Sequence, residues 1–407
     1  MFPWFAVGHM TLFPHLSNRL AERDCFITFL LPAKAIQQLQ HFNLHPHLIT
    51  FQPLTVPHVD GLPTGTQTAS DIPIQLNHLL ATALDRTRDQ VETVIYDIRP
   101  KLVNVAHWVP EITKLLGIEA INYSVVSAAS IAIVLVPARN VPKDRAITEA
   151  ELLPFGEGIT FYERIPKAMK TSDALAIRTC HETEGQLCDY IGSQYGKSVF
   201  LTRHVLPEPS KRPLEDRWCK WLSGFQRGSV VFCAFGSQII LEKNQFQELV
   251  LGFELTGLPF LVALKPPKGA STVEEALPEG FEERVKGRGV VRGAWVQQLM
   301  ILDHPSVGCF VNHCGFGSMW ESLMSDCQLV LVPHLGDQIL NARFMAQDGW
   351  FSKESLSKAI HSVMNKGSAV GSILKENHRK WREMLENKGS MSSYVDKFVQ
   401  NMQQLVK

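Results

Sequence analysis

The sequence has no long apolar run, no excess of one charge and no regular cysteine spacing among its 407 residues. The longest apolar stretch, 128–138, is too short to cross a bilayer, and the first residues show neither the basic region nor the cleavage site of a signal peptide. The 40 basic residues balance 40 acidic ones, which gives no reason to expect a nucleic-acid or anionic membrane partner. We therefore expect a cytoplasmic protein without stable membrane insertion, a monomer whose partners are small molecules.

The eight cysteines form no C-x-x-C pair and no disulfide framework, which favours reduced, mostly buried thiols. They stand at positions 25, 180, 188, 219, 233, 309, 314 and 327.

What the sequence does contain is a regular alternation of strand-like and helical stretches. The chain is long for one core, so we expect two domains. In the first half the alternating stretches are 10–22, 26–31, 48–51 and 71–84, and a second series begins at 229–235, about 242–255 and 260–264. This alternation indicates βα units around parallel sheets. We predict two Rossmann-like, doubly wound α/β domains that face each other across a cleft.

The boundary between these domains is expected at 205–213, which is rich in proline and charge and suits an extended linker. The N-terminal domain would then span 1–204 and the C-terminal domain 214–385. The stretch 377–405 looks helical, and about 386–407 is expected to pack back onto the first domain.

Two strand-to-helix turns carry groups that suit a diphosphate. Phe235-Gly-Ser237 ends an apolar strand, and His313-Cys-Gly-Phe-Gly-Ser318 lies between a strand at 307–311 and a helix. In open α/β sheets, ligands bind beyond the carboxyl ends of the strands. Helix N-terminal amides, with His313 and Ser318, could donate to phosphate oxygens there. The alternative is a plain glycine turn beside a core histidine.

Groups suited to a base and to a sugar flank these turns. The indole of Trp295 could stack on a base whose edge pairs with the Val296 backbone. Asp337 and Gln338 set a carboxylate beside an amide, a pair that suits vicinal hydroxyls. The alternatives are a core tryptophan and an ordinary helix N-terminus.

One histidine is a candidate general base. His9 lies between a short first strand and a helix that starts near Met10, and its ordinary pKa is close to neutral; a histidine without catalytic role is the alternative. The glycine-rich stretch 287–293 has the wrong spacing for a dinucleotide fingerprint, and no strand-to-helix turn follows it. This argues against a nicotinamide-dependent dehydrogenase, which we keep as a rival.

The whole of 295–338 resembles, without insertion or deletion, the signature box of plant family 1 UDP-dependent glycosyltransferases. Three phrases, Pro3–His9 and Val231–Ser237 outside this box and His313–Glu321 within it, resemble the branch that adds a sugar to flavonoid or anthocyanin glycosides. The resemblance extends over essentially the whole chain. It implies a GT-B fold in which the N-terminal domain binds the acceptor and the C-terminal domain binds the UDP-sugar, without a metal or other cofactor.

The resemblance also assigns the donor contacts. It implies that Trp295 stacks on uracil, that Val296 and Gln298 contact the base and ribose, and that Glu321 holds the ribose hydroxyls. It implies that the diphosphate is bound by Ser237, His313 and Ser318 with the loop residues Gly315 and Gly317. Asp337 and Gln338 would bind the sugar. Because Gln338 is the family's usual residue for glucose-type donors, glucose is expected, with xylose and rhamnose kept open. An acceptor pocket would draw on Trp4, Phe5, Trp108, Tyr123 and Ser124, since aromatic walls suit flat polyphenols.

The chain departs from the family at the catalytic partner. In the family, His9 would take the acceptor proton during a single inverting displacement, oriented by an aspartate. Asn104 falls nearest the aspartate's place, and an amide can fix the histidine tautomer but cannot stabilise an imidazolium. A catalytically impaired nucleotide-sugar binder is therefore the alternative. The chain is also shorter than the family near Glu151–Pro154 and between Gln347 and Asp348, and has Phe316 and Gly317 where most relatives have tryptophan and asparagine.

Overall fold

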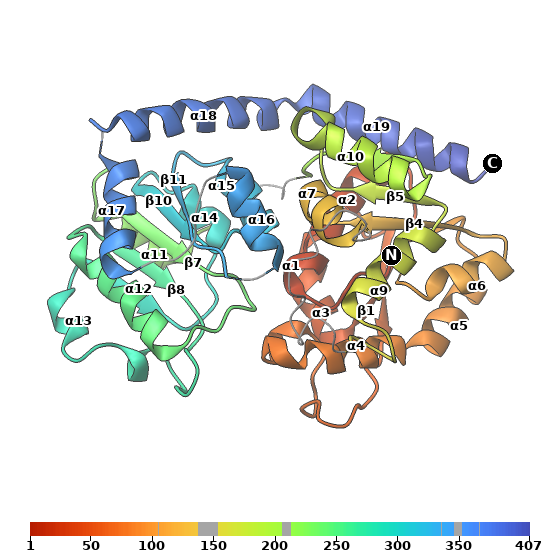
Figure 1. Ribbon diagram of the computed structural model, residues 1–407, viewed down its shortest axis with the longest axis horizontal. Coiled ribbons are helices and arrows are strands. Elements are labelled where there is room, and N and C mark those ends of the chain that lie inside the picture. The colour runs from red at the N-terminus through yellow and green to blue at the C-terminus, as the bar shows by residue number, and fades with distance from the viewer. Residues whose placement is uncertain (105, 137–153, 206–212, 335, 346–351, 366) are drawn as a thin grey trace, which may run out of the picture. The chain divides into compact units, whose positions relative to one another are not determined.

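A computed structural model describes the chain except residues 105, 137–153, 206–212, 335, 346–351 and 366 (Figure 1). The chain divides into two compact units: unit 1 is Met1–Pro207 with Lys388–Lys407, and unit 2 is Glu208–Asn387. The predicted linker and the shortened places near 151–154 and 347–348 lie mostly or wholly outside the described residues. None of the described helices is long and apolar enough to span a membrane.

Unit 1 is built on parallel strands. β1 (Ile27–Pro32) pairs with β2 (Ile49–Leu54), and a four-stranded sheet has the order β3-β4-β5-β6. The strands of that sheet are β3 (Leu102–Asn104), β4 (Glu119–Ser124), β5 (Ala174–Ile177) and β6 (Val199–Leu201). The helices are α1 (Val7–Met10), α2 (Leu12–Ala21), α3 (Ala33–Leu39), α4 (Asn77–Asp85), α5 (Arg88–Ile98), α6 (Val109–Leu115), α7 (Ala128–Ser130), α9 (Phe161–Thr171), α10 (His181–Tyr195) and α19 (Lys388–Leu405).

The start of unit 1 differs from the prediction. No strand forms over the first six residues: Met1 alone bonds to β1, through its amino group to the Thr28 carbonyl and through its carbonyl to the Leu30 amide. Pro3 has no N–H with which to continue such a ladder. His9 lies inside α1 rather than between a strand and a helix.

Unit 2 contains a five-stranded parallel sheet of order β11-β10-β7-β8-β9. Its strands are β7 (Val230–Ala234), β8 (Phe260–Ala263), β9 (Gly289–Arg292), β10 (Val307–Asn312) and β11 (Gln328–Leu331). Its helices are α11 (Asp216–Ser223), α12 (Lys243–Leu255), α13 (Phe281–Arg284), α14 (Gln298–Leu302), α15 (Phe316–Ser322), α16 (Gly336–Met345), α17 (Lys353–Met364) and α18 (Ala369–Glu386). β8 and β9 continue the sheet on one side of β7, and β10 and β11 continue it on the other. The strand order therefore reverses between the neighbouring strands β7 and β10, while all strands stay parallel.

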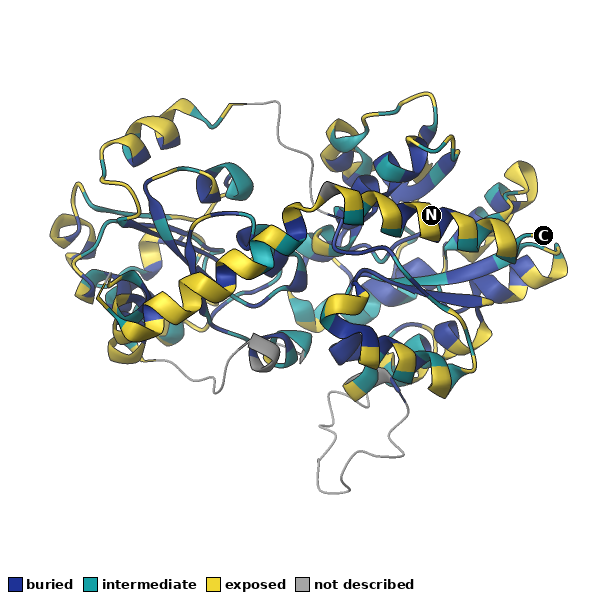
Figure 2. Ribbon diagram, turned by 90° about the horizontal axis from the view of Figure 1, so that it is seen from above, coloured by how far each residue is buried: buried dark blue, intermediate teal, exposed yellow. Residues whose placement is uncertain are grey.

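Both faces of the unit 2 sheet are covered, as a doubly wound fold requires. Val231 and Cys233 of β7 pack in one core with α12 and α17, whereas Phe232 of the same strand packs in a second core with α11 and α14. The strands are accordingly buried, while exposed residues gather on the outward faces of helices (Figure 2).

The predicted continuous C-terminal helix is broken at Asn387 into α18 and α19. α19 belongs to unit 1, where Asp396 pairs with Arg23 at 2.6 Å and the Tyr394 hydroxyl donates to Glu182 at 2.7 Å. All eight cysteines are free, and all but Cys25 and Cys219 are buried, as the sequence predicts.

Candidate functional site

The segments predicted to bind the donor all follow strands of the unit 2 sheet. Ser237 comes after β7, Trp295 after β9, His313 after β10, and Asp337 after β11. Because these strands are parallel, their carboxyl ends lie at one edge of the sheet. The structure therefore brings residues up to about 100 positions apart to one edge of the sheet. The point where the strand order reverses, between β7 and β10, lies in the middle of this edge.

His313 follows β10 at the point where the strand order reverses between β7 and β10. A Cβ added to Gly236, in the loop after β7, would stand 2.9 Å from its Nε2, and one added to Gly315 would stand 2.5 Å away. Only glycines at both places leave room for the imidazole, which links the two turns. Burial lowers the pKa of His313 to about 4, so the ring is neutral at neutral pH. It can donate an N–H to a diphosphate but adds no positive charge.

A single amide joins the predicted diphosphate and ribose groups. Nε2 of Gln298, the first residue of α14, donates to Oε2 of Glu321 at 3.0 Å and to Oγ of Ser318 at 3.3 Å. Both acceptors lie on α15, whose first turn also includes Gly317. These predicted donor-binding side chains therefore form one connected group.

Trp295 is no core tryptophan, because the residue is 80% exposed. Its ring is therefore open to stacking. The neighbouring Val296 is buried, and its carbonyl accepts from the Gln298 amide at 2.8 Å. Pairing of a base edge with that carbonyl would share an existing hydrogen bond.

The predicted sugar-binding pair begins α16. Oε1 of Gln338 accepts from the His334 amide at 3.0 Å, and Oδ2 of Asp337 accepts from Nδ2 of Asn341 at 3.3 Å. Burial raises the pKa of the Asp337 carboxyl, an effect that the Asn341 hydrogen bond opposes. The side chains of Asp337 and Gln338 are thus both hydrogen-bonded to residues within four positions of them.

Two buried asparagines at this edge were not predicted from the sequence. Asn312 ends β10 and accepts from the Cys314 amide at 2.8 Å, and Asn341 donates to the Cys314 carbonyl at 3.1 Å. Cys314 is a non-glycine residue with a positive φ of 63°. The only sequence signals were an asparagine just before the turn and another four positions after Asp337, neither of which is specific.

No hydrogen bond joins the two residues predicted for catalysis, His9 and Asn104, in the described part of the chain. His9 is half-buried, and no hydrogen bond to its imidazole exists among the residues that the structure describes. Oδ1 of Asn104 instead accepts from the Tyr123 amide at 3.0 Å, where it ties β3 to β4. Burial lowers the pKa of His9 to about 4. The imidazole is therefore neutral at neutral pH, as a general base must be.

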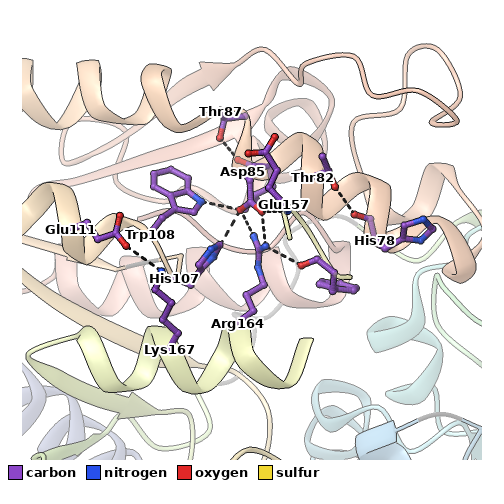
Figure 3. Close-up of polar contacts among 12 residues, drawn as sticks. His78, Thr82, Asp85, Thr87, His107, Trp108, Glu111, Glu157, Arg164 and Lys167 are labelled. Atoms are coloured by element: carbon purple, nitrogen blue, oxygen red, sulfur yellow. Dashed lines mark hydrogen bonds and ion pairs between the residues drawn. The ribbon is translucent and has the colours of Figure 1, made fainter. Parts of the chain in front are cut away.

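The residues predicted for the acceptor divide into two groups by burial. Trp4, Tyr123 and Ser124 are partly exposed. Phe5 is fully buried and Trp108 nearly so. The indole N–H of Trp108 donates to Asp85 at 2.9 Å in the buried cluster of Figure 3. Phe5 and Trp108 thus pack in the core of unit 1, so their burial favours a structural role over contact with an acceptor.

No group of three or more histidine, cysteine or acidic side chains that could hold a metal ion occurs in the described parts of the chain.

Comparison with known proteins places this chain in a family. A family model described as UDP-glucoronosyl and UDP-glucosyl transferase matches residues 275–385. UDP-glycosyltransferase 79B3 of Arabidopsis thaliana is 55% identical, with 100% of this chain and 97% of that protein covered. Anthocyanidin 3-O-glucoside 2'''-O-xylosyltransferase of the same plant is 52% identical with the same coverage. Both alignments are longer than this chain, so the relatives contain residues that it lacks.

Solved structures share the fold at lower identity. Arabidopsis thaliana UGT89C1 complexed with UDP-L-rhamnose has a TM-score of 0.81 at 21% identity, with 98% of both chains covered. Glycyrrhiza uralensis UGT73P12 complexed with glycyrrhetinic acid 3-O-monoglucuronide has a TM-score of 0.83 at 18% identity, with 99% of this chain and 95% of that chain covered.

These likenesses confirm the predicted α/β fold of the GT-B type and are incompatible with a nicotinamide-dependent dehydrogenase. Since more than half of its residues match these relatives over its whole length, the chain belongs to the plant family 1 UDP-glycosyltransferases, in the branch related to flavonoids.

Proposed function

We propose that this glycosyltransferase moves glucose from UDP-glucose to a hydroxyl of a plant flavonoid or flavonoid glycoside, with inversion at the anomeric carbon and His9 as general base. Unit 2 binds the donor and unit 1 binds the acceptor. The observation that carries the proposal is the gathering of the donor segments at the carboxyl edge of the unit 2 sheet, around His313.

The donor is held without a metal in this proposal. Trp295 stacks on uracil, and Glu321, bridged by Gln298 to Ser318, holds the ribose. The diphosphate takes N–H donors from His313 and from the backbone after β10. Such preorganised donors stabilise the charge that develops on the leaving diphosphate.

The chemical step is a single displacement. The acceptor oxygen attacks the anomeric carbon, the bond from that carbon to the diphosphate oxygen breaks, and the acceptor proton passes to His9. UDP leaves with the bonding electrons. Because burial keeps His9 neutral, the imidazole is ready to accept that proton.

The similarity to an enzyme named for xylose transfer to an anthocyanidin glucoside supports a glycoside as acceptor and makes UDP-xylose the second donor to test. A catalytically impaired nucleotide-sugar binder is the other candidate function. It is favoured by one observation, that His9 and Asn104 are not joined by a hydrogen bond.

The test is turnover of UDP-glucose and UDP-xylose with flavonols, anthocyanidins and their 3-O-glucosides, followed by the mass of the products. We expect a sugar-sized mass gain that His9→Ala reduces by about 10² to 10⁴-fold. His58→Ala, which changes a histidine with a 71% exposed side chain, is the control and should retain activity. Binding of UDP by calorimetry without any product would favour the impaired binder, and an active His9→Ala variant would exclude His9 as the base.

A further inference from the structure

The turn after β10 contains a strained peptide that is held from both sides. Cys314 adopts a positive φ of 63°, a conformation that L-residues with a side chain rarely take. Asn312 accepts from its N–H at 2.8 Å, and Asn341 donates to its carbonyl at 3.1 Å. Such strain persists only where the surroundings hold it.

Asn341 also reaches the predicted sugar site. It lies four residues after Asp337 on α16, so the two side chains share one face of the helix. Its Nδ2 has two hydrogens, and it donates to the Cys314 carbonyl at 3.1 Å and to Oδ2 of Asp337 at 3.3 Å. Asn341 is 2% exposed, so water does not compete for these bonds.

We propose that Asn341 is a positioning residue for the donor sugar: its amide holds the Asp337 carboxylate at a set place relative to the Cys314 peptide and the turn that binds the diphosphate. The inference rests on the proposed function, because it takes Asp337 to bind the sugar and this turn to bind the diphosphate. The contacts themselves join the turn after β10 to α16, which follows the neighbouring strand β11, and all of them lie within unit 2.

The role predicts a selective defect. UDP contacts only the base, ribose and diphosphate groups, whereas UDP-glucose also depends on where Asp337 points. Without the amide, the half-buried carboxylate loses a donor and can rotate.

The test compares UDP with UDP-glucose in calorimetry, using Asn341→Leu, which keeps most of the volume and removes both N–H donors. We expect the dissociation constant for UDP-glucose to rise about tenfold or more, and that for UDP to rise several-fold less. If Asn341→Leu does not fold, Asn341→Ala is the second variant, and we expect it to show the same selective loss of UDP-glucose affinity.

A double-mutant cycle with Asp337→Asn sharpens the test. If Asn341 acts through Asp337, the two losses in UDP-glucose affinity are less than additive, whereas UDP binding shows no coupling. Equal losses for both ligands, or additive losses for UDP-glucose, would show that Asn341 only supports the fold.

Asn18 provides a matched control in unit 1. It is equally buried, donates to the Phe42 carbonyl at 2.8 Å and accepts from the Leu44 amide at 3.1 Å. Asn18→Leu should lower the unfolding temperature as Asn341→Leu does, yet leave the ratio of the two affinities unchanged. A wild-type protein that binds UDP but neither UDP-glucose nor UDP-xylose contradicts the proposed donor, and this inference with it. Wild-type binding of both UDP and UDP-glucose, with no selective loss in the variant, contradicts the inference alone.

Discussion

At the scale of single residues, burial decides what the two predicted site histidines can do. It lowers the pKa of both His9 and His313 to about 4, so each is neutral at neutral pH. For His313 this leaves hydrogen bonding without charge. For His9 it leaves a base that is free to act but weakly basic, which limits the driving force for proton transfer.

A substitution at Asn104 tests whether this residue serves His9. Asn104→Asp should change kcat/KM by less than about threefold, because its oxygen is already bonded to the Tyr123 amide rather than to the imidazole. The acid limb of the pH profile should stay near the pKa of His9, about 4. A tenfold gain in kcat/KM with an acid limb moved to higher pH would instead show that a carboxylate at this place reaches His9.

Trp295 permits a test of binding without a change in stability. Because the residue is 80% exposed, Trp295→Ala should leave the unfolding temperature almost unchanged. Loss of stacking on a base costs about 1–3 kcal/mol, so UDP affinity should fall about tenfold. Trp320, which is buried against Trp381 and Phe316, is the contrast: Trp320→Ala should lower stability by about 3–5 kcal/mol. Unchanged UDP binding in Trp295→Ala would remove this residue from the site.

At the scale of elements, a buried ion pair holds a loop of unit 1. Figure 3 shows Asp85, the last residue of α4, at the centre of contacts with Arg164 of α9 and with Trp108. Asp85 also accepts from the Glu157 amide at 3.0 Å. A Cβ on Gly156 would stand 2.1 Å from Nη1 of Arg164, so the loop backbone runs directly against the pair.

Breaking this pair should destabilise unit 1. Arg164→Ala leaves Asp85 buried without its cation, which costs about 3–5 kcal/mol in the free energy of unfolding. Arg86→Ala removes the exposed partner of Glu157 on the same loop and should cost less than about 1 kcal/mol. Urea unfolding followed by circular dichroism measures both. A similar small loss for the two variants would mean that the loop does not depend on the buried pair.

At the scale of the whole molecule, buried neutral histidines make stability depend on pH. Burial lowers the pKa of each of the following below its ordinary value: His9, His15, His107, His204 and His313. A folded-state pKa below that of the unfolded chain means that the unfolded chain takes up protons first as the pH falls. Their contribution is therefore complete above pH about 6.5 and is lost progressively toward pH 4.

The unfolding temperature should accordingly fall by about 10 °C or more between about pH 7.5 and about pH 5. The raised pKa values of Asp303 and Asp337 act in the opposite direction but involve fewer groups. Differential scanning calorimetry at the two pH values checks this. A melting temperature that is constant or rises toward pH 5 would contradict it.

The sequence by itself determined most of the architecture of unit 2 and the family. Apolar strands bounded by glycine turns are local patterns, so the predicted strands at 229–235, 260–264 and 307–311 agree with β7, β8 and β10 to within one or two residues. The signature box is also local, and the segments that it predicts to bind the donor do follow strands of the unit 2 sheet. Each of these features depends on neighbours along the chain.

Only the tertiary structure decided which side chains meet and which are buried. Trp295 is exposed, whereas Phe5 and Trp108 are buried in the core, although the sequence shows all three only as aromatic residues. The contact of Asn341 with Cys314 joins residues 27 positions apart in the sequence. Such pairings depend on how neighbouring strands are ordered in the sheet, and no periodicity within either segment encodes them.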